Sequence, residues 1–153
     1  MERNSLKDQL RNVLEEARMV LPGIQALFGF QTVAVFNQAF SELPSATQAV
    51  HLVALLSVVS AIALVMMPAA WHRIVEPHRV STTTVSLASR LICAALLPLA
   101  VGLALDIYVV VFAVTRSTAV AVSVAVTTAT VLIGLWFAIP FLRRSFDHDG
   151  QPS

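Results

Sequence analysis

The sequence predicts an all-α integral membrane protein, a four-helix bundle in the bilayer with an N-terminal amphipathic interfacial helix. Three observations predict this class. Of the 153 residues, 57% are hydrophobic and only 12% are charged, which is more apolar surface than a water-soluble domain of this size can bury. Four apolar stretches are long enough to cross roughly 30 Å of hydrocarbon, which takes about 20 helical residues. The basic residues also fall on alternate sides of these stretches.

The whole chain, residues 1–153, is predicted to be one membrane domain ending in a cytoplasmic tail at 142–153. The four transmembrane spans are placed at about residues 21–41, 49–68, 86–111 and 118–141. Because the outer connections are short, spans one and two, and spans three and four, are expected to be antiparallel neighbours.

The distribution of basic residues predicts the orientation, because lysine and arginine are retained on the cytoplasmic side of a membrane. Only Arg116 lies between spans three and four, on the predicted outer side. The other nine lie on the opposite side: Arg3, Lys7, Arg11, Arg18, Arg73, Arg79, Arg90, Arg143 and Arg144. Both termini are therefore expected in the cytoplasm.

The predicted interfacial helix covers residues 4–20. Ser5 and Asp8 have the spacing of a capping box, and apolar residues recur on one helical face at Leu6, Leu10, Val13, Leu14, Ala17 and Leu21. Such a helix is expected to lie at the cytoplasmic surface and to bend into the first span at Pro22-Gly23. The alternative is a straight continuation of the first span into the cytoplasm.

The first span is the most polar of the four. It contains Gln25, Gln31, Thr32, Asn37 and Gln38, and at helical spacing Gln31 and Gln38 share one face. Amides in lipid form hydrogen bonds to neighbouring helices. Two interpretations follow, interhelical hydrogen bonding and a polar pore lining.

Histidines and the single cysteine give no sign of a metal site. His72 and His78 follow the predicted stop or kink at Pro68, but they are six positions apart, and neither a cysteine nor a His-x-x-Glu-His pattern is nearby. Cys93 has no cysteine partner in the chain, so an intramolecular disulfide is excluded.

Small residues predict a close contact between the third and fourth spans. In the third span, the residues at successive i+4 positions are Ser86, Arg90, Ala94, Pro98, Gly102 and Asp106. In the fourth, a similar stripe consists of Ala119, Ser123, Thr127, Thr130 and Gly134. Small-residue stripes let helix backbones approach closely in lipid, so we expect the two stripes to pack on each other.

Asp106 is the candidate for ion chemistry, because an ionisable side chain within a membrane span is a functional hypothesis. It lies about 30 Å along the helix from Ser86, near the outer edge of the hydrocarbon. Its candidate partners are His51, which would form a pH-sensitive pair, Arg116, which would form an outer salt bridge, and the amides Asn37 and Gln38. The alternatives are a structural anchor and proton or cation handling.

Several function classes are excluded by motif. The chain has no glycine-rich phosphate loop, no G-x-S-x-G elbow, no paired carboxylates in its spans and no basic patch interleaved with aromatic residues. We therefore expect a non-enzymatic protein with no cofactor, no metal and no nucleic-acid partner.

Three segments carry a resemblance: "EEARMVLPGIQALFGFQTVAVF", "HLVALLSVVSAIALVMMPAAWHRI" and "SRLICAALLPLAVGLALDIYVV". Over roughly residues 12–140 the chain resembles a family of small bacterial four-span membrane proteins with no established function, some of which are automatically named sodium:proton antiporters. The resemblance implies a location in the inner (plasma) membrane. Its marks are Glu15, Glu16, Arg18, Pro22, Gly23, Gln25 and Pro68–Arg73.

Five of these residues are expected to meet at the cytoplasmic boundary: Glu16, Arg18, Gln25, His72 and Arg73. Such a cluster either binds anionic lipid or a partner subunit, or fastens the N-terminal helix to the loop after the second span by charge pairing.

Two functional hypotheses result. The first is a structural or accessory membrane protein whose small-residue stripes support a homo-oligomer or a partner membrane subunit in the lipid bilayer. The second is a small oligomeric transporter of protons or monovalent cations that uses Asp106, His51, Gln31 and Gln38. The second requires an oligomer, because four helices of this size hardly enclose a pathway.

Overall fold

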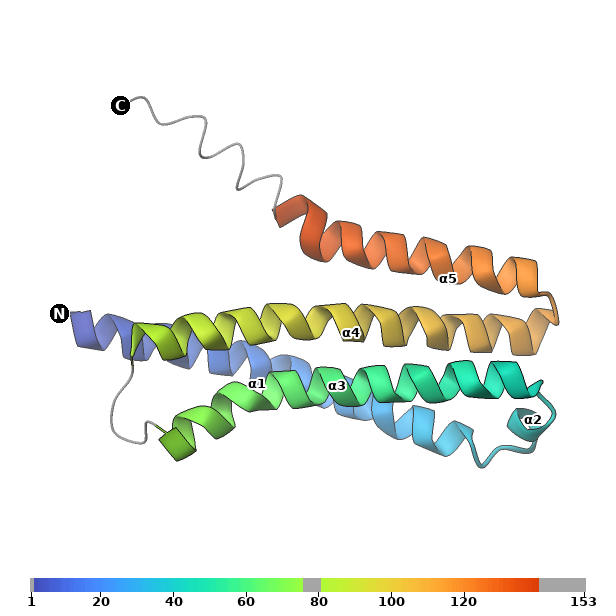
Figure 1. Ribbon diagram of the computed structural model, residues 1–153, viewed down its shortest axis with the longest axis horizontal. Helices are drawn as coiled ribbons and strands as arrows, with labels where there is room; N and C mark the ends of the chain where they lie inside the picture. The colour runs from blue at the N-terminus through green and yellow to red at the C-terminus, as the bar shows by residue number, and fades with distance from the viewer. Residues whose placement is uncertain (1, 76–80, 141–153) are drawn as a thin grey trace, which may run out of the picture.

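The computed structural model describes residues 2–75 and 81–140, which are helical over most of their length and contain no strand. The helices are α1 (Glu2–Ala34), α2 (Gln38–Ser41), α3 (Ser45–Val75), α4 (Thr82–Thr115) and α5 (Thr118–Ile133), followed by the π-helical segment η1 (Gly134–Ala138). The long helices run lengthwise beside one another (Figure 1). The all-α class is confirmed.

Three helical stretches in the described part of the chain are long and apolar enough to cross a membrane: Ser45–Val75, Thr82–Thr115 and Thr118–Ala138. They contain the second and third predicted spans and most of the fourth. The predicted first span, residues 21–41, is not among them. Its polar side chains lower the hydropathy of α1, and the helix ends at Ala34, before the predicted end of the span.

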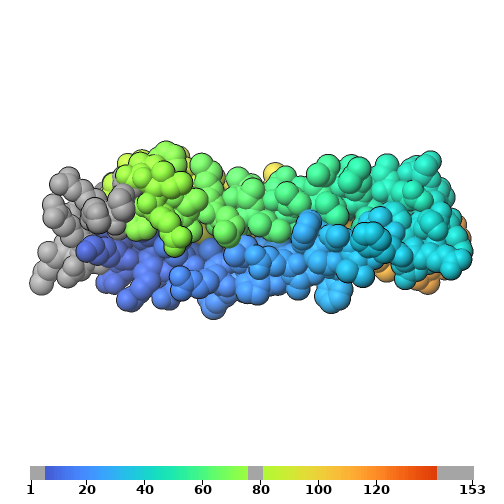
Figure 2. Space-filling view, turned by 90° about the horizontal axis from the view of Figure 1, so that it is seen from below, coloured from blue at the N-terminus to red at the C-terminus, as the bar shows by residue number. Residues whose placement is uncertain are grey.

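Helix α1 is continuous through Pro22, so the predicted bend at Pro22-Gly23 and the separate interfacial helix over residues 4–20 are not seen. Its buried residues recur every seventh position, at Leu10, Ala17, Ile24 and Gln31. This spacing forms one narrow seam along a helix, and the seam contacts both α3 and α4. A proline removes one backbone hydrogen bond, and here packing on both sides of Pro22 keeps the helix intact. Figure 2 shows α1 lying along α3.

Helices α3 and α4 approach each other closely at Gly102. A Cβ atom added there would lie 2.8 Å from Cγ2 of Val58 and 3.1 Å from the backbone oxygen of Ala54. Both distances are shorter than ordinary carbon contacts, so only glycine fits without a shift of the two helices. Around this point the core contains Val58, Ala61, Val65, Ala95 and Leu99, together with Ala17 and Ile24 of α1.

Helix α5 contacts α4, but the contact differs from the predicted one. Gly102 faces α3, Ala94 is exposed and Pro98 is half-buried, so the predicted ridge does not pack on α5 as a unit. The physical reason is that each i+4 step advances about 40° around a helix, so the ridge faces different neighbours along its length. On α5, Ser123, Thr127 and Thr130 are exposed, Gly134 is half-buried with open space beside it, and only Ala121 is buried.

The connection between α1 and α3 is held by side chains. Asn37 caps α2 by accepting a hydrogen bond from the backbone N–H of Ala39 at 3.0 Å. The Gln48 amide donates to the backbone oxygens of Leu43 at 3.0 Å and Phe40 at 3.2 Å. These bonds fix the short helix α2 over the start of α3, where the candidate site lies.

Candidate functional site

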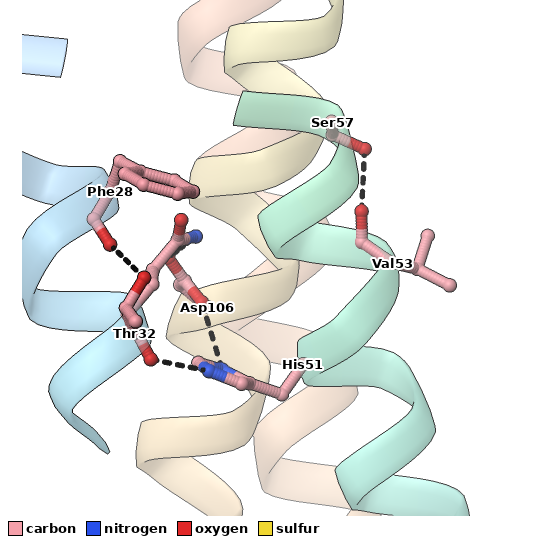
Figure 3. A network of polar contacts seen from close by, with 7 residues as sticks. Phe28, Thr32, His51, Val53, Ser57 and Asp106 are labelled. Carbon is pink, nitrogen blue, oxygen red and sulfur yellow. Dashed lines mark hydrogen bonds and ion pairs between the residues drawn. The ribbon is translucent and has the colours of Figure 1, made fainter. Parts of the chain in front are cut away.

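Three polar side chains from three helices meet inside the bundle: Gln31 from α1, His51 from α3 and Asp106 from α4. Gln31 is 3% exposed and His51 is 5% exposed, and the Asp106 side chain is 16% exposed. Figure 3 shows His51 and Asp106 directed toward each other between the helices. We call this set the Gln31–His51–Asp106 network.

Three contacts join the network. The side-chain amide of Gln31 donates a hydrogen bond from Nε2 to Oδ2 of Asp106. Nε2 of His51 lies 3.0 Å from the backbone oxygen of Gln31, and Nδ1 of His51 lies 3.4 Å from Oδ1 of Asp106. His51 therefore lies between an oxygen of α1 and an oxygen of α4.

The helix ends explain this arrangement. Gln31 lies in the last turn of α1, where backbone carbonyls have no intrahelical N–H partner. His51 supplies the donor from the second turn of α3. The carboxyl end of a helix also carries partial negative charge, which favours a cationic side chain. Phe40 of α2 packs edge-on against the imidazole, with ring centroids 5.1 Å apart.

The hydrogen-bonding capacity of these groups implies a bound proton. A backbone carbonyl only accepts, so Nε2 of His51 carries a hydrogen when it bonds to Gln31. The second ring nitrogen, Nδ1, faces a carboxylate oxygen. This contact is attractive only when one more proton is present, either on Nδ1 or on Asp106, because otherwise two lone pairs face each other. The His51–Asp106 pair thus has a place for one proton.

The Gln31 amide has unused bonding capacity. Its Oε1 atom is buried and has no hydrogen-bond partner within the part of the chain that the structure describes. Leaving a buried acceptor unpaired costs about 1–3 kcal/mol. The atom is therefore suited to accept a hydrogen bond from a water molecule or to contact a small cation next to Asp106.

The other residues predicted at this site lie outside the network. Gln38 is exposed at the start of α2, and Asn37 caps that helix. Arg116 is exposed in the turn between α4 and α5, with a left-handed φ of 54°. Of the candidate partners for Asp106, the structure places His51 beside it. Sequence reasoning missed the backbone oxygen of Gln31, which no residue type reveals.

The predicted cytoplasmic cluster is not assembled among the described residues. Glu16, Arg18, Gln25 and Arg73 are exposed, and His72 is half-buried with its Nδ1 atom unpartnered. The charges of α1 pair locally instead, because Arg11 lies 3.7 Å from Asp8 and 3.8 Å from Glu15 on the same helix. His78 and the predicted tail lie outside the described residues. In the described part of the chain, no three potential metal ligands lie together.

Comparison with known proteins identifies a family without a known activity. Residues 2–140 match DUF6328, a family of unknown function. This match spans α1 to η1 and includes all three members of the Gln31–His51–Asp106 network. No curated protein and no solved structure matches the chain at a significant level.

Proposed function

The chain belongs to the DUF6328 family, whose function is unknown, and we propose that it is a non-enzymatic membrane protein that transports protons through the Gln31–His51–Asp106 network. The observation that carries the proposal is the position of His51 between two acceptors, 3.0 Å from the Gln31 oxygen and 3.4 Å from Asp106. Imidazole changes its protonation state near neutral pH. A buried pair that needs one proton is suited to take up and release it.

We propose that the protein lies in the inner membrane with both termini in the cytoplasm. The N-terminal end of α1, the end of α3 and the start of α4 lie at one end of the bundle (Figure 1). These segments contain the described basic residues Lys7, Arg11, Arg18, Arg73 and Arg90. The network lies toward the opposite end. Asp106 precedes the end of α4 at Thr115 by roughly 14 Å of helix, so in this proposed orientation it would lie in the outer half of the bilayer.

A complete pathway is proposed to require several copies of the chain. A single copy contributes only a few membrane helices, and α5 exposes Ser123, Thr127 and Thr130 on its surface. These hydroxyls bond to carbonyls of their own helix, so they allow a second backbone to approach without leaving donors unpaired. We place the contact between copies on this face and lipid on the remaining apolar surface.

Sodium is the second ion to test, because Gln31 Oε1 and the Asp106 carboxylate are both oxygen ligands and Oε1 has no partner in the described structure. Oxygen atoms are the ligands that hard cations prefer. A cation bound at these atoms would compete with the proton held by Asp106 and His51.

The decisive experiment is proton flux into proteoliposomes that enclose a pH-sensitive dye, with the membrane potential clamped. Wild type is expected to exceed empty vesicles, and Asp106→Asn is expected to fall to their level because an amide cannot exchange the proton. Gln38→Asn is the matched control, since Gln38 is polar, exposed and outside the network. It is expected to retain wild-type flux. Each protein is first shown to reconstitute to the same density.

Equal flux in wild type and Asp106→Asn, or no flux in wild type, would refute transport through this carboxylate. The network would then serve only to join three helices, as expected of an accessory or scaffold protein. Repeating the assay with external sodium decides whether the cation enters the same site, because competition would slow proton release only in proteins that retain Asp106.

A further inference from the structure

We infer that the Gln31–His51–Asp106 network is a pH-dependent switch that fixes α1 on α3 and α4 when it holds a proton and releases α1 when the proton leaves. The inference rests on the proposed function in one respect, the binding of one proton by His51 and Asp106. It adds a moving element, α1, to that site.

Both polar contacts of α1 with the network come from one residue. The amide of Gln31 bonds to Asp106 on α4, and the backbone oxygen of Gln31 bonds to His51 on α3. The other buried positions of α1 are Leu10, Ala17 and Ile24, which are apolar. A change at Gln31 therefore affects all the polar anchoring that the network gives α1.

The contact surface beneath α1 is also looser than the contact between α3 and α4. A cavity of about 80 Å³ lies between α1, α3 and α4, with Glu16, Ile24, Val65, Cys93 and Leu99 in its wall. By contrast, α3 and α4 approach closely, because a Cβ atom added to Gly102 would lie 2.8 Å from Cγ2 of Val58 and 3.1 Å from the backbone oxygen of Ala54. In addition, α1 is not among the helices apolar enough to span a membrane. Of the three helices that meet at the network, α1 is the one that can move while the others stay packed.

Loss of the proton forces the network to break one contact. A neutral imidazole has a single N–H. With the hydrogen on Nε2, the bond to Gln31 remains and the lone pair of Nδ1 faces the Asp106 carboxylate. With the hydrogen on Nδ1, the bond to Asp106 remains and the lone pair of Nε2 faces the Gln31 oxygen. An ionised carboxylate accepts a stronger hydrogen bond than a neutral carbonyl, so the tautomer with the hydrogen on Nδ1 is favoured once the proton leaves. In that tautomer α1 keeps the Gln31 amide bond to Asp106 and loses the bond from His51, so raising the pH weakens the attachment of α1.

No other titratable group contacts His51 from the described helices packed against it. Gln31 of α1 presents a neutral carbonyl, Phe40 of α2 presents an aromatic ring, and Asp106 of α4 is the charged neighbour. The direction of the switch thus follows from the His51–Asp106 pair, with α1 attached at low pH and released at high pH.

The variant Asp106→Asn separates the switch from simple loss of a contact. An asparagine accepts from Gln31 through Oδ1 and donates through Nδ2 to Nδ1 of neutral His51. The Nε2 hydrogen then remains on the Gln31 oxygen. Because every network contact is satisfied without an exchangeable proton, this variant is expected to keep α1 attached at every pH.

The test is a distance measurement between pairs of spin labels in lipid bilayers, in a background that carries Cys93→Ser because the native thiol is exposed. The reporting pair is Gly29→Cys on α1, where a Cβ atom meets nothing within 4 Å, and Leu52→Cys on α3, which is 57% exposed. The reference pair is Leu52→Cys with Val110→Cys on α4, which is 59% exposed. Spectra are recorded at about pH 5 and about pH 9, on either side of the imidazole titration range.

The α1–α3 distance is expected to be single at low pH and to gain a second, longer population at high pH, while the α3–α4 distance stays constant. With Asp106→Asn, the low-pH distribution is expected at both values. An α1–α3 distance that ignores pH in the otherwise wild-type protein overturns the switch, and so does a pH response that persists in Asp106→Asn. Proton flux measured on the same proteins distinguishes the two proposals. Flux with an α1 that does not move would refute only the switch. Movement of α1 without flux would refute only transport.

Discussion

Replacing His51 with leucine is expected to lower the free energy of unfolding by about 1–3 kcal/mol, the usual cost of leaving a buried polar group without its hydrogen-bond partner. The Asp106 carboxyl group would stay in the bundle without its imidazole partner, and the Gln31 oxygen at the end of α1 would lose its donor. The loss is measured by unfolding in mixtures of sodium dodecyl sulfate and dodecyl maltoside, followed by circular dichroism.

The double variant His51→Leu with Asp106→Leu is expected to lose less free energy of unfolding than the summed losses of the two single variants. Replacing both partners by apolar side chains removes the unpaired charge along with the pair, and groups in contact are non-additive by about 0.5–3 kcal/mol. Gln38→Leu is the control, since an exposed substitution changes stability by about 0.5 kcal/mol or less. Additive losses in the double variant would show that His51 and Asp106 do not interact in the membrane.

The helices in the apolar part of the chain were predictable, because the backbone N–H and C=O groups of a segment in lipid must bond to each other, and a helix achieves this within the segment. The predicted spans at residues 49–68 and 86–111 lie inside α3 and α4, respectively. The observed helices are longer, because hydropathy detects only the part within the hydrocarbon. Where a helix continues past the hydrocarbon, hydropathy does not mark the residue at which the helix ends.

The course of α1 was not predictable from local signals. Pro22 and Gly23 are residues that favour a bend, yet the helix passes through them. The signal that identifies its true packing is the seven-residue spacing from Leu10 to Gln31, which continues across the proline. Tertiary contact on both sides of Pro22 thus outweighs the local tendency to bend.

The candidate site was predictable in its residue types and not in its bonding. A carboxylate in a span indicates a partner, and His51 is at the matching level of the neighbouring helix. The contact through the backbone of Gln31 depends on where α1 ends, and hydropathy does not define that end. Similarly, the small residues near Gly102 predict a close contact but do not say whether α3 or α5 makes it.

Replacing Gly102 with alanine is expected to lower the free energy of unfolding by about 1–3 kcal/mol, as overpacking in a core does, despite the gain of about 1 kcal/mol in helix propensity. The new methyl group would lie 2.8 Å from Cγ2 of Val58 and 3.1 Å from the Ala54 oxygen. The side chain of Val58 can move aside, but the Ala54 oxygen belongs to the backbone of α3, so α4 itself must shift.

Gly134→Ala is the matched control for Gly102→Ala, because a Cβ atom at Gly134 meets nothing within 4 Å. It is expected to leave stability unchanged or to raise it by up to about 1 kcal/mol. Adding Val58→Ala to Gly102→Ala is expected to relieve the contact with the side chain and leave the one with the backbone. Asp106 lies one helical turn beyond Gly102, so a shift of α4 also moves the carboxylate relative to His51 and lowers proton flux. Equal stability of the two single alanine variants would contradict the α3–α4 contact that positions Asp106 beside His51.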